Sequence, residues 1–199
     1  MSRVLAIALV AVTVACDGPD GGPGSSDDGG SALAPVVLRA GEVPEGLGLE
    51  LEPDPTGTGP IASIRDVLPP RRRLPNLPPL PDGLAEGFVE GYRRSFAGAD
   101  GTASSTVVRM ADPTVASALV AYLQLLPVGG HAGTPEEVPA TGLGEKGYGW
   151  RLLVPRRESS GYVWRSGDLV AAVTLSGPVG RATPEASLAL AERVDERLA

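Results

Sequence analysis

Residues 161–175 read GYVWRSGDLVAAVTL, and this stretch indicates the class of fold most directly. Two runs rich in aromatic and β-branched residues, 161–165 and 169–175, flank a Ser-Gly-Asp tripeptide. Such runs are typical of strands, and Gly followed by Asp between them is typical of a tight turn. The stretch therefore predicts a β-hairpin, and with it an antiparallel sheet.

Further strands are predicted on the N-terminal side of this hairpin. In residues 148–154 every second side chain is bulky and apolar, which is the period of a strand. Residues 86–97 and 102–110 are expected to pair as a second hairpin across a turn at 98–101. The aromatic residues within 86–97 are spaced for either a helix or one face of a strand, and two glycines there favour the strand.

Two helix starts are predicted, one at Asp112 and Pro113 and the other at Thr183 and Pro184. In each pair a capping residue precedes a proline, which fits the first position of a helix. Apolar residues then recur at helical spacing: Val115, Leu119, Tyr122, Leu123 and Leu126 after the first start, and Leu188, Ala191, Val194 and Leu198 after the second. These elements together predict an α+β fold, in which two main helices pack on one face of an antiparallel sheet.

Length and composition limit the classes of protein that are plausible. The chain has 199 residues, which is one domain of ordinary size with some extra sequence. With 17 basic and 24 acidic residues, the balance of charge argues against a general nucleic-acid binder. A single Cys excludes both a disulfide within a monomer and a zinc site built from cysteines. We expect no cofactor and no metal.

The first sixteen residues predict export from the cytoplasm. A basic start at Arg3 is followed by twelve uncharged residues at 4–15, and then by Cys16, the one cysteine of the chain. The uncharged run is too short to span a bilayer, which takes about 20 apolar residues. A basic start, a short apolar run and a small residue at the end describe a signal peptide.

Residues 13–16 (TVAC) resemble a bacterial lipobox, in which Ala15 and Cys16 match the pattern and Thr13 stands where Leu, Val or Ile is usual. The resemblance implies that the signal peptide is cut between Ala15 and Cys16. It also implies that the sulfur of Cys16 carries a diacylglyceryl group, which would hold the chain on the extracytoplasmic face of the cell membrane. Ordinary secretion and an uncleaved anchor are the alternatives.

The chain is expected to have three parts. Residues 1–15 are the signal peptide, and residues 16–34 are the lipidated Cys followed by a flexible tether of Gly, Ser, Asp and Pro. Residues 35–199 form a single α+β extracytoplasmic domain. Within it, the proline-rich residues 69–81 are expected to cross the surface in an extended conformation. There are two alternatives for this stretch. It could be a peptide ligand for a partner, or its three arginines could contact anionic lipid or polymer.

The order of elements behind a lipobox resembles small secreted actinobacterial lipoproteins of the PsbP-like/LpqN type. The resemblance is carried by residues 143–145 (LGE), the hairpin at 165–170 (RSGDLV) and the closing helix to Arg197 and Leu198. It implies a non-catalytic binding or accessory role at the cell envelope, with an unknown envelope protein or a small ligand as partner. The Cys pairs of related sensor-type extracellular domains are absent, which argues against that branch.

Catalytic motifs are scarce in this sequence. Residues 142–147 match G-x-G-x-x-G, but a strand pattern follows them where a dinucleotide site needs a helix. There is no G-x-S-x-G motif. A hydrolase would have to use His131, the only histidine, as its general base. We expect no enzyme activity, with such a hydrolase as the third hypothesis.

Four aromatic residues form the remaining candidate site. Tyr148 and Trp150, and again Tyr162 and Trp164, form a Tyr-x-Trp pattern on two predicted strands. Facing inward, these side chains would belong to the core. Facing outward, they would form a platform for a glycan or an apolar ligand. The second hypothesis for function is therefore a carrier of such a ligand, with a pocket between helix and sheet.

Overall fold

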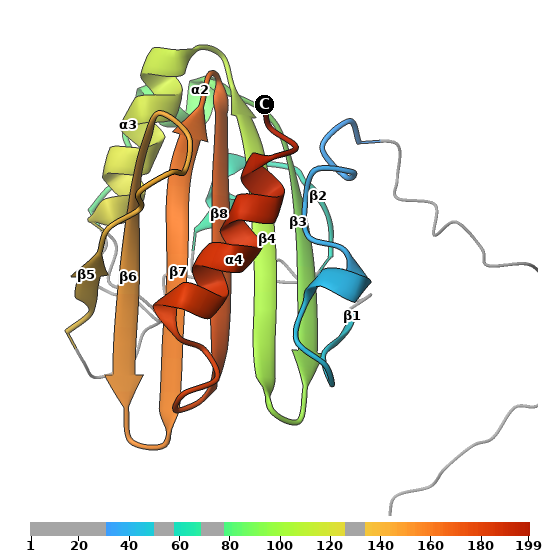
Figure 1. The fold of residues 1–199 in the computed structure, drawn as a ribbon. Coiled ribbons are helices and arrows are strands. Elements are labelled where there is room, and N and C mark those ends of the chain that lie inside the picture. The colour runs from blue at the N-terminus through green and yellow to red at the C-terminus, as the bar shows by residue number, and fades with distance from the viewer. Residues whose placement is uncertain (1–30, 50–57, 69–77, 126–133) are drawn as a thin grey trace, which may run out of the picture.

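A computed structural model describes residues 31–49, 58–68, 78–125 and 134–199 (Figure 1). In these ranges eight strands form one sheet, in the order β1-β3-β4-β8-β7-β6-β5 with β2 beside β3, and all paired strands are antiparallel. The strands are β1 (Gly48–Leu49), β2 (Gly59–Ile61), β3 (Phe88–Gly98), β4 (Gly101–Met110), β5 (Glu136–Val138), β6 (Lys146–Val154), β7 (Arg157–Ser166) and β8 (Leu169–Pro178).

Three hairpins build the centre of the sheet. The two predicted hairpins are confirmed, β3–β4 with Gly98 opposite Gly101 and β7–β8 with Ser166 opposite Leu169. The third hairpin, β6–β7, was not predicted. Its turn contains Arg156 with a φ of 68°, a left-handed conformation that glycine usually adopts. Because no glycine marks this turn, the sequence pattern does not show it.

The predicted helix starts are confirmed for α3 (Pro113–Gln124) and α4 (Pro184–Asp195). The Asp112 carboxylate accepts hydrogen bonds from the backbone N–H groups of the first turn of α3, and the Thr183 hydroxyl does so for α4. The shorter elements are η1 (Ala40–Glu42), α1 (Ile64–Val67) and α2 (Asp82–Glu86). The α+β class with an antiparallel sheet is confirmed. None of the helices in the described ranges is long and apolar enough to cross a membrane.

The two long helices cover opposite faces of the sheet, and the expectation that both pack on one face is wrong. On β7, Trp164 belongs to the core cluster under α4, whereas its neighbour Val163 belongs to the cluster under α3. Neighbouring residues of a strand point to opposite faces. Strands β7 and β8 are therefore apolar on both faces, and each face needs its own cover. Figure 1 shows α4 lying across β7 and β8 on the side toward the viewer.

Residues 31–43, which we call the N-terminal segment, complete the core on the α4 face. Four of its side chains are buried in the same cluster as Trp164: Leu33, Ala34, Val37 and Leu38. The backbone N–H of Leu38 also donates a buried hydrogen bond of 2.8 Å to the Ser105 hydroxyl on β4. The folded domain thus includes Leu33 and Ala34, and the expected boundary between tether and domain at residue 35 lies too late.

The C-terminal end of the chain holds the N-terminal segment in place. The Arg197 guanidinium donates hydrogen bonds to the backbone carbonyls of Val36 at 3.3 Å and Val37 at 3.0 Å, and it pairs with Glu42. Arg193 of α4 donates to the Glu42 carbonyl at 3.0 Å. Both ends of the described chain therefore lie close together. In Figure 1 they lie at the upper end of the sheet, and the turns of β3–β4 and β6–β7 lie at the lower end.

Replacing Leu33 by Ala should lower the free energy of unfolding by about 2–5 kcal/mol, because the substitution leaves a cavity in the core where Leu33 is 1% exposed. Leu125→Ala is the matched control, since Leu125 is 69% exposed and should change stability by less than about 0.5 kcal/mol. Urea unfolding followed by circular dichroism measures both. Equal stability of the two variants would show that Leu33 belongs to the tether after all.

Candidate functional site

The structure does not bring the four aromatic residues of the predicted platform together. On β7, Tyr162 and Trp164 point under α4, where Trp164 is 0% exposed and donates its indole N–H to the Asp195 carboxylate at 2.6 Å. On β6, Tyr148 lies opposite Val163 of β7 and therefore points to the other face. The two Tyr-x-Trp pairs are thus separated by the sheet, and they do not form one platform.

Tyr148 and Trp150 are half-buried on the α3 face. The Trp150 ring lies over Gly161, where a Cβ atom would be 2.8 Å from a ring carbon. A glycine is therefore needed opposite Trp150. Burial raises the pKa of the Tyr148 hydroxyl well above its ordinary value. Burial also raises the pKa of Tyr162, and the nearby carboxylates of Glu185 and Glu192 add to this effect.

The other predicted site residues fall into two groups. Ala15, Cys16, His131 and most of the proline-rich stretch lie outside the described residues. The G-x-G-x-x-G stretch at 142–147 is described, and its last two residues already belong to strand β6. Its Glu145 carboxylate accepts a hydrogen bond from the backbone N–H of Gly167 at 3.1 Å and pairs with Arg165. The stretch therefore fastens the β7–β8 turn.

A pocket lies at the lower end of the sheet, and its first wall is the loop after β8. The Glu158 carboxylate on β7, which is 0% exposed, accepts hydrogen bonds from the backbone N–H of Gly180 at 2.7 Å and from Arg151 at 2.8 Å. The Ser160 hydroxyl lies 2.8 Å from the carbonyl of Ala182. The contacts of Glu158 with Gly180 and of Ser160 with Ala182 therefore hold this loop against the end of the sheet, and Arg151 pairs with the other oxygen of Glu158.

The opposite wall is formed by the chain before β1 and by the β3–β4 turn. A Cβ atom at Gly98 would lie 2.0 Å from the carbonyl oxygen of Gly46, and one at Gly101 would lie 2.1 Å from that of Ser176. Only glycine allows approaches this close. The two glycines of this turn therefore let the chain before β1 and the end of β8 come together around the pocket.

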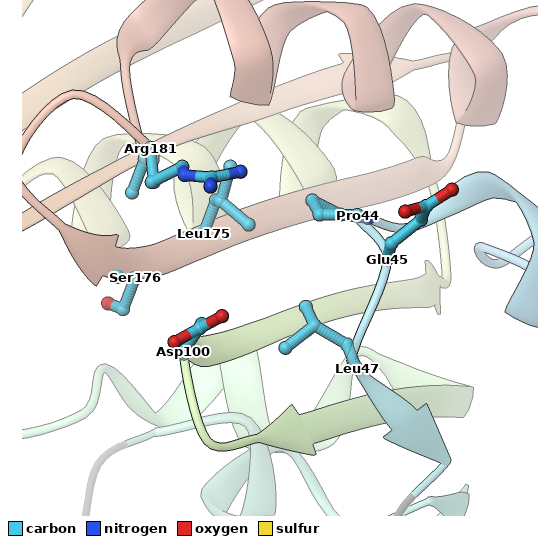
Figure 2. Close-up of a pocket in the computed structure, with 10 residues that line it drawn as sticks. Pro44, Glu45, Leu47, Asp100, Leu175, Ser176 and Arg181 are labelled. Carbon is cyan, nitrogen blue, oxygen red and sulfur yellow. The ribbon is translucent and has the colours of Figure 1, made fainter.

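The pocket has a volume of about 120 Å³. Figure 2 shows Arg181 and Asp100 on opposite sides of it, with Leu175 beside Arg181 and Leu47 on the same side as Asp100. The residues that line it are Pro44, Glu45, Leu47, Asp100, Gly101, Leu175, Ser176, Gly177, Arg181 and Ala182. Its floor is thus mostly apolar and its rim is charged.

The charged side chains of the rim are not used by the fold. In the part of the chain that the structure describes, Glu45, Asp100 and Arg181 form no side-chain hydrogen bond or ion pair. By contrast, Arg109, Arg151, Arg165 and Arg197 are each paired with a carboxylate. Charged groups of both signs at a pocket rim, with their hydrogen-bonding capacity unused, are suited to binding a polar ligand.

The size and chemistry of the pocket limit what it can accept. Sites for drug-sized molecules have volumes of about 300–1,000 Å³, so this pocket fits a small molecule or a single side chain. No histidine, lysine or cysteine lines it. Across the described ranges, no three His, Cys, Asp or Glu side chains gather in an arrangement that could hold a metal ion.

Sequence patterns did not indicate this pocket, because its lining comes from four separate parts of the chain between residues 44 and 182. The one local signal was the pair of glycines at 98 and 101, which predicted the hairpin turn.

The fold and the pocket together define an α+β domain with a small pocket at one end of its sheet. The structure is similar to that of the extracellular domain of PknH from Mycobacterium tuberculosis. The TM-score is 0.50 at 10% sequence identity, and the similarity covers 83% of this chain and 93% of that one. At this identity the similarity concerns the fold. No family model matches the chain, and no curated protein matches it in sequence.

Gly101→Ala should destabilise the protein by about 1–3 kcal/mol, because the new Cβ would overlap the Ser176 carbonyl oxygen and force the β3–β4 turn away from β8. Gly83→Ala in α2 is the control, since nothing lies within 4 Å of its Cβ position. Alanine there should be neutral or slightly stabilising. Thermal unfolding measures both, and a Gly101→Ala variant as stable as the control would contradict the close approach.

Raising the pH above about 10, the ordinary pKa of tyrosine, should lower the free energy of unfolding. The pKa of Tyr148 is raised in the folded protein, so the unfolded chain loses this proton first. The contribution of Tyr148 to stability is fully present below the pKa of its hydroxyl in the unfolded chain. It is lost as the pH rises toward the raised pKa of the same hydroxyl in the folded protein. Tyr148→Phe should reduce this loss in denaturant unfolding measured across that range. An unchanged loss would mean that the Tyr148 hydroxyl is exposed.

Proposed function

We propose that the protein is a lipid-anchored, extracytoplasmic binding protein of the cell envelope with an accessory role. The lipobox-like residues 13–16 support the anchor, with Cys16 as the lipidated residue and cleavage after Ala15. In this proposal the partner is a small ligand or an envelope protein, and the protein does not catalyse a reaction. The resemblance of the sequence to PsbP-like/LpqN-type lipoproteins supports the same role.

One observation carries the binding part of the proposal: the described domain begins at the end of the sheet opposite the pocket (Figure 1). A chain anchored at Cys16 would reach the domain through residues 17–30, which are Gly, Asp, Ser and Pro. A spacer of this composition and length has a reach of roughly 20 Å. The spacer would therefore let the domain stand clear of the lipid surface, with the pocket at the end of the sheet far from the point of attachment, where a partner can approach it.

The composition of the pocket supports binding over catalysis. General acid–base or nucleophilic chemistry most often uses His, Asp, Glu, Lys, Cys or an activated Ser. The lining holds no histidine, lysine or cysteine, and its two carboxylates, Asp100 and Glu45, belong to the rim. The one hydroxyl in the lining is that of Ser176, which lies 2.5 Å from the Ser159 hydroxyl and is thus already in a hydrogen bond. The charged groups of the rim are suited to holding a ligand by ion pairs.

The anchor is tested by the intact mass of the protein isolated from the membrane fraction, beside a Cys16→Ser variant. We expect a mature chain that begins at Cys16 and carries the mass of a diacylglyceryl group. The variant should lack this mass and keep residues 1–15. An unmodified chain recovered outside the membrane fraction would refute the lipid anchor and favour ordinary secretion.

A further inference from the structure

We propose that the pocket binds a free α-amino acid with an aliphatic side chain, in its zwitterionic form. This inference rests on the binding role proposed above and names the class of ligand. The carboxylate of the ligand would pair with Arg181, and its ammonium group with Asp100. The aliphatic side chain would lie on Leu47 and Leu175.

The signs of the charges favour a ligand that carries both. Arg181 offers only hydrogen-bond donors, and the carboxylates of Asp100 and Glu45 offer only acceptors. A purely anionic ligand would place its charge beside Asp100, and a purely cationic ligand would meet Arg181. Like charges brought together on binding cost free energy and reject such ligands. A zwitterion pairs with both sides of the rim.

The arrangement of the rim matches this assignment. Arg181 and Asp100 lie on opposite sides of the pocket and do not form an ion pair with each other. Arg181 belongs to the loop that Glu158 and Ser160 hold in place, and Asp100 belongs to the turn fixed by Gly101. The two charged groups are therefore carried by well-supported backbone, so binding needs little additional ordering of the main chain.

The size and floor of the pocket select the rest of the ligand. An apolar cavity of about 150 Å³ holds a molecule of the size of benzene, so a pocket of about 120 Å³ has room for a small aliphatic group. Pro44, Leu47, Leu175 and Ala182 supply an apolar floor, in which Leu175 is 3% exposed and Ala182 is 0% exposed. Glycans and nucleotides are much larger than this space. An amino acid such as leucine fits both the size and the polarity.

The test is a titration of the isotope-labelled chain, as isolated from cells, followed through its backbone amide resonances. We expect leucine to shift the amides of Gly101, Gly177 and Ala182 in a saturable manner, with an affinity near the millimolar range because the paired groups are exposed. Leucinamide lacks the carboxylate and 4-methylpentanoate lacks the ammonium group. Each should bind at least about tenfold more weakly than leucine, since each loses one charge-assisted hydrogen bond.

Two variants test the assigned roles, and a third is the control. Arg181→Ala should weaken the binding of leucine about tenfold, and this variant should bind leucine and leucinamide equally well. Asp100→Asn should also weaken the binding of leucine about tenfold, and this variant should bind leucine and 4-methylpentanoate equally well. Arg65→Ala removes an exposed arginine of α1, outside the pocket, and should bind leucine unchanged. All three positions are exposed, so the variants should fold, as unchanged thermal unfolding will verify.

The absence of any saturable shift with leucine would overturn the inference. So would equal binding of leucine and its two analogues, or equal binding by the chain with Arg181→Ala and by the control. None of these results depends on the modification of Cys16, which the intact mass measures separately. A failed titration with a lipidated chain would leave the anchored accessory role in place with a different partner. Leucine binding by a chain without lipid would refute the anchor alone.

Discussion

The sheet is wider than a helix, and the arrangement of the molecule follows from this constraint. Seven strands lie side by side along the path of the sheet, which makes it roughly 29 Å wide at a spacing of about 4.8 Å. An α-helix with its side chains is about 10–12 Å across. Helix α4 therefore covers β7 and β8 but cannot also cover β3 and β4. The N-terminal segment covers these strands, and its four buried side chains join those of α4 in one core.

Polar contacts then determine where the loops at the lower end lie. Burial of the Glu158 carboxylate is costly unless its oxygens are paired, and the Arg151 guanidinium and the Gly180 N–H together satisfy both. The same contacts place Arg181 at the rim of the pocket. The glycines at 98 and 101 bring the facing turn close. One wall of the pocket is thus held by the buried contacts of Glu158, and the other by the close approach of backbone that the two glycines allow.

Local signals in the sequence predicted the five long strands, two of the three hairpins and both helix starts, because each depends on residues within a few positions of one another. The short strands β2 and β5 were not predicted. Asp112 and Thr183 act as caps in the way their sequence context indicates. The sides on which the helices pack were not predictable from the same signals. Trp164 and Val163 are neighbours, and both are buried, so periodicity alone does not show which helix covers which face.

The candidate site was harder to predict than the fold for a related reason. The four aromatic residues share a pattern in the sequence, but the register between β6 and β7 sends the two pairs to opposite faces. Register is a property of paired strands, and a single-strand pattern does not contain it. The pocket brings together Glu45, Asp100 and Arg181 from distant parts of the chain. None of these residues is unusual in its own sequence context.

The route by which the chain enters the core has a mechanical consequence. Leu33 is buried two residues after the described chain begins at Ser31, so there is no slack between the preceding residues and the hydrophobic core. Tension on the preceding chain would act first on the N-terminal segment, and then on the hydrogen bonds from Arg197 to Val36 and Val37. The fold would yield from this corner, whereas the Glu158 contacts at the far end of the sheet would be strained last.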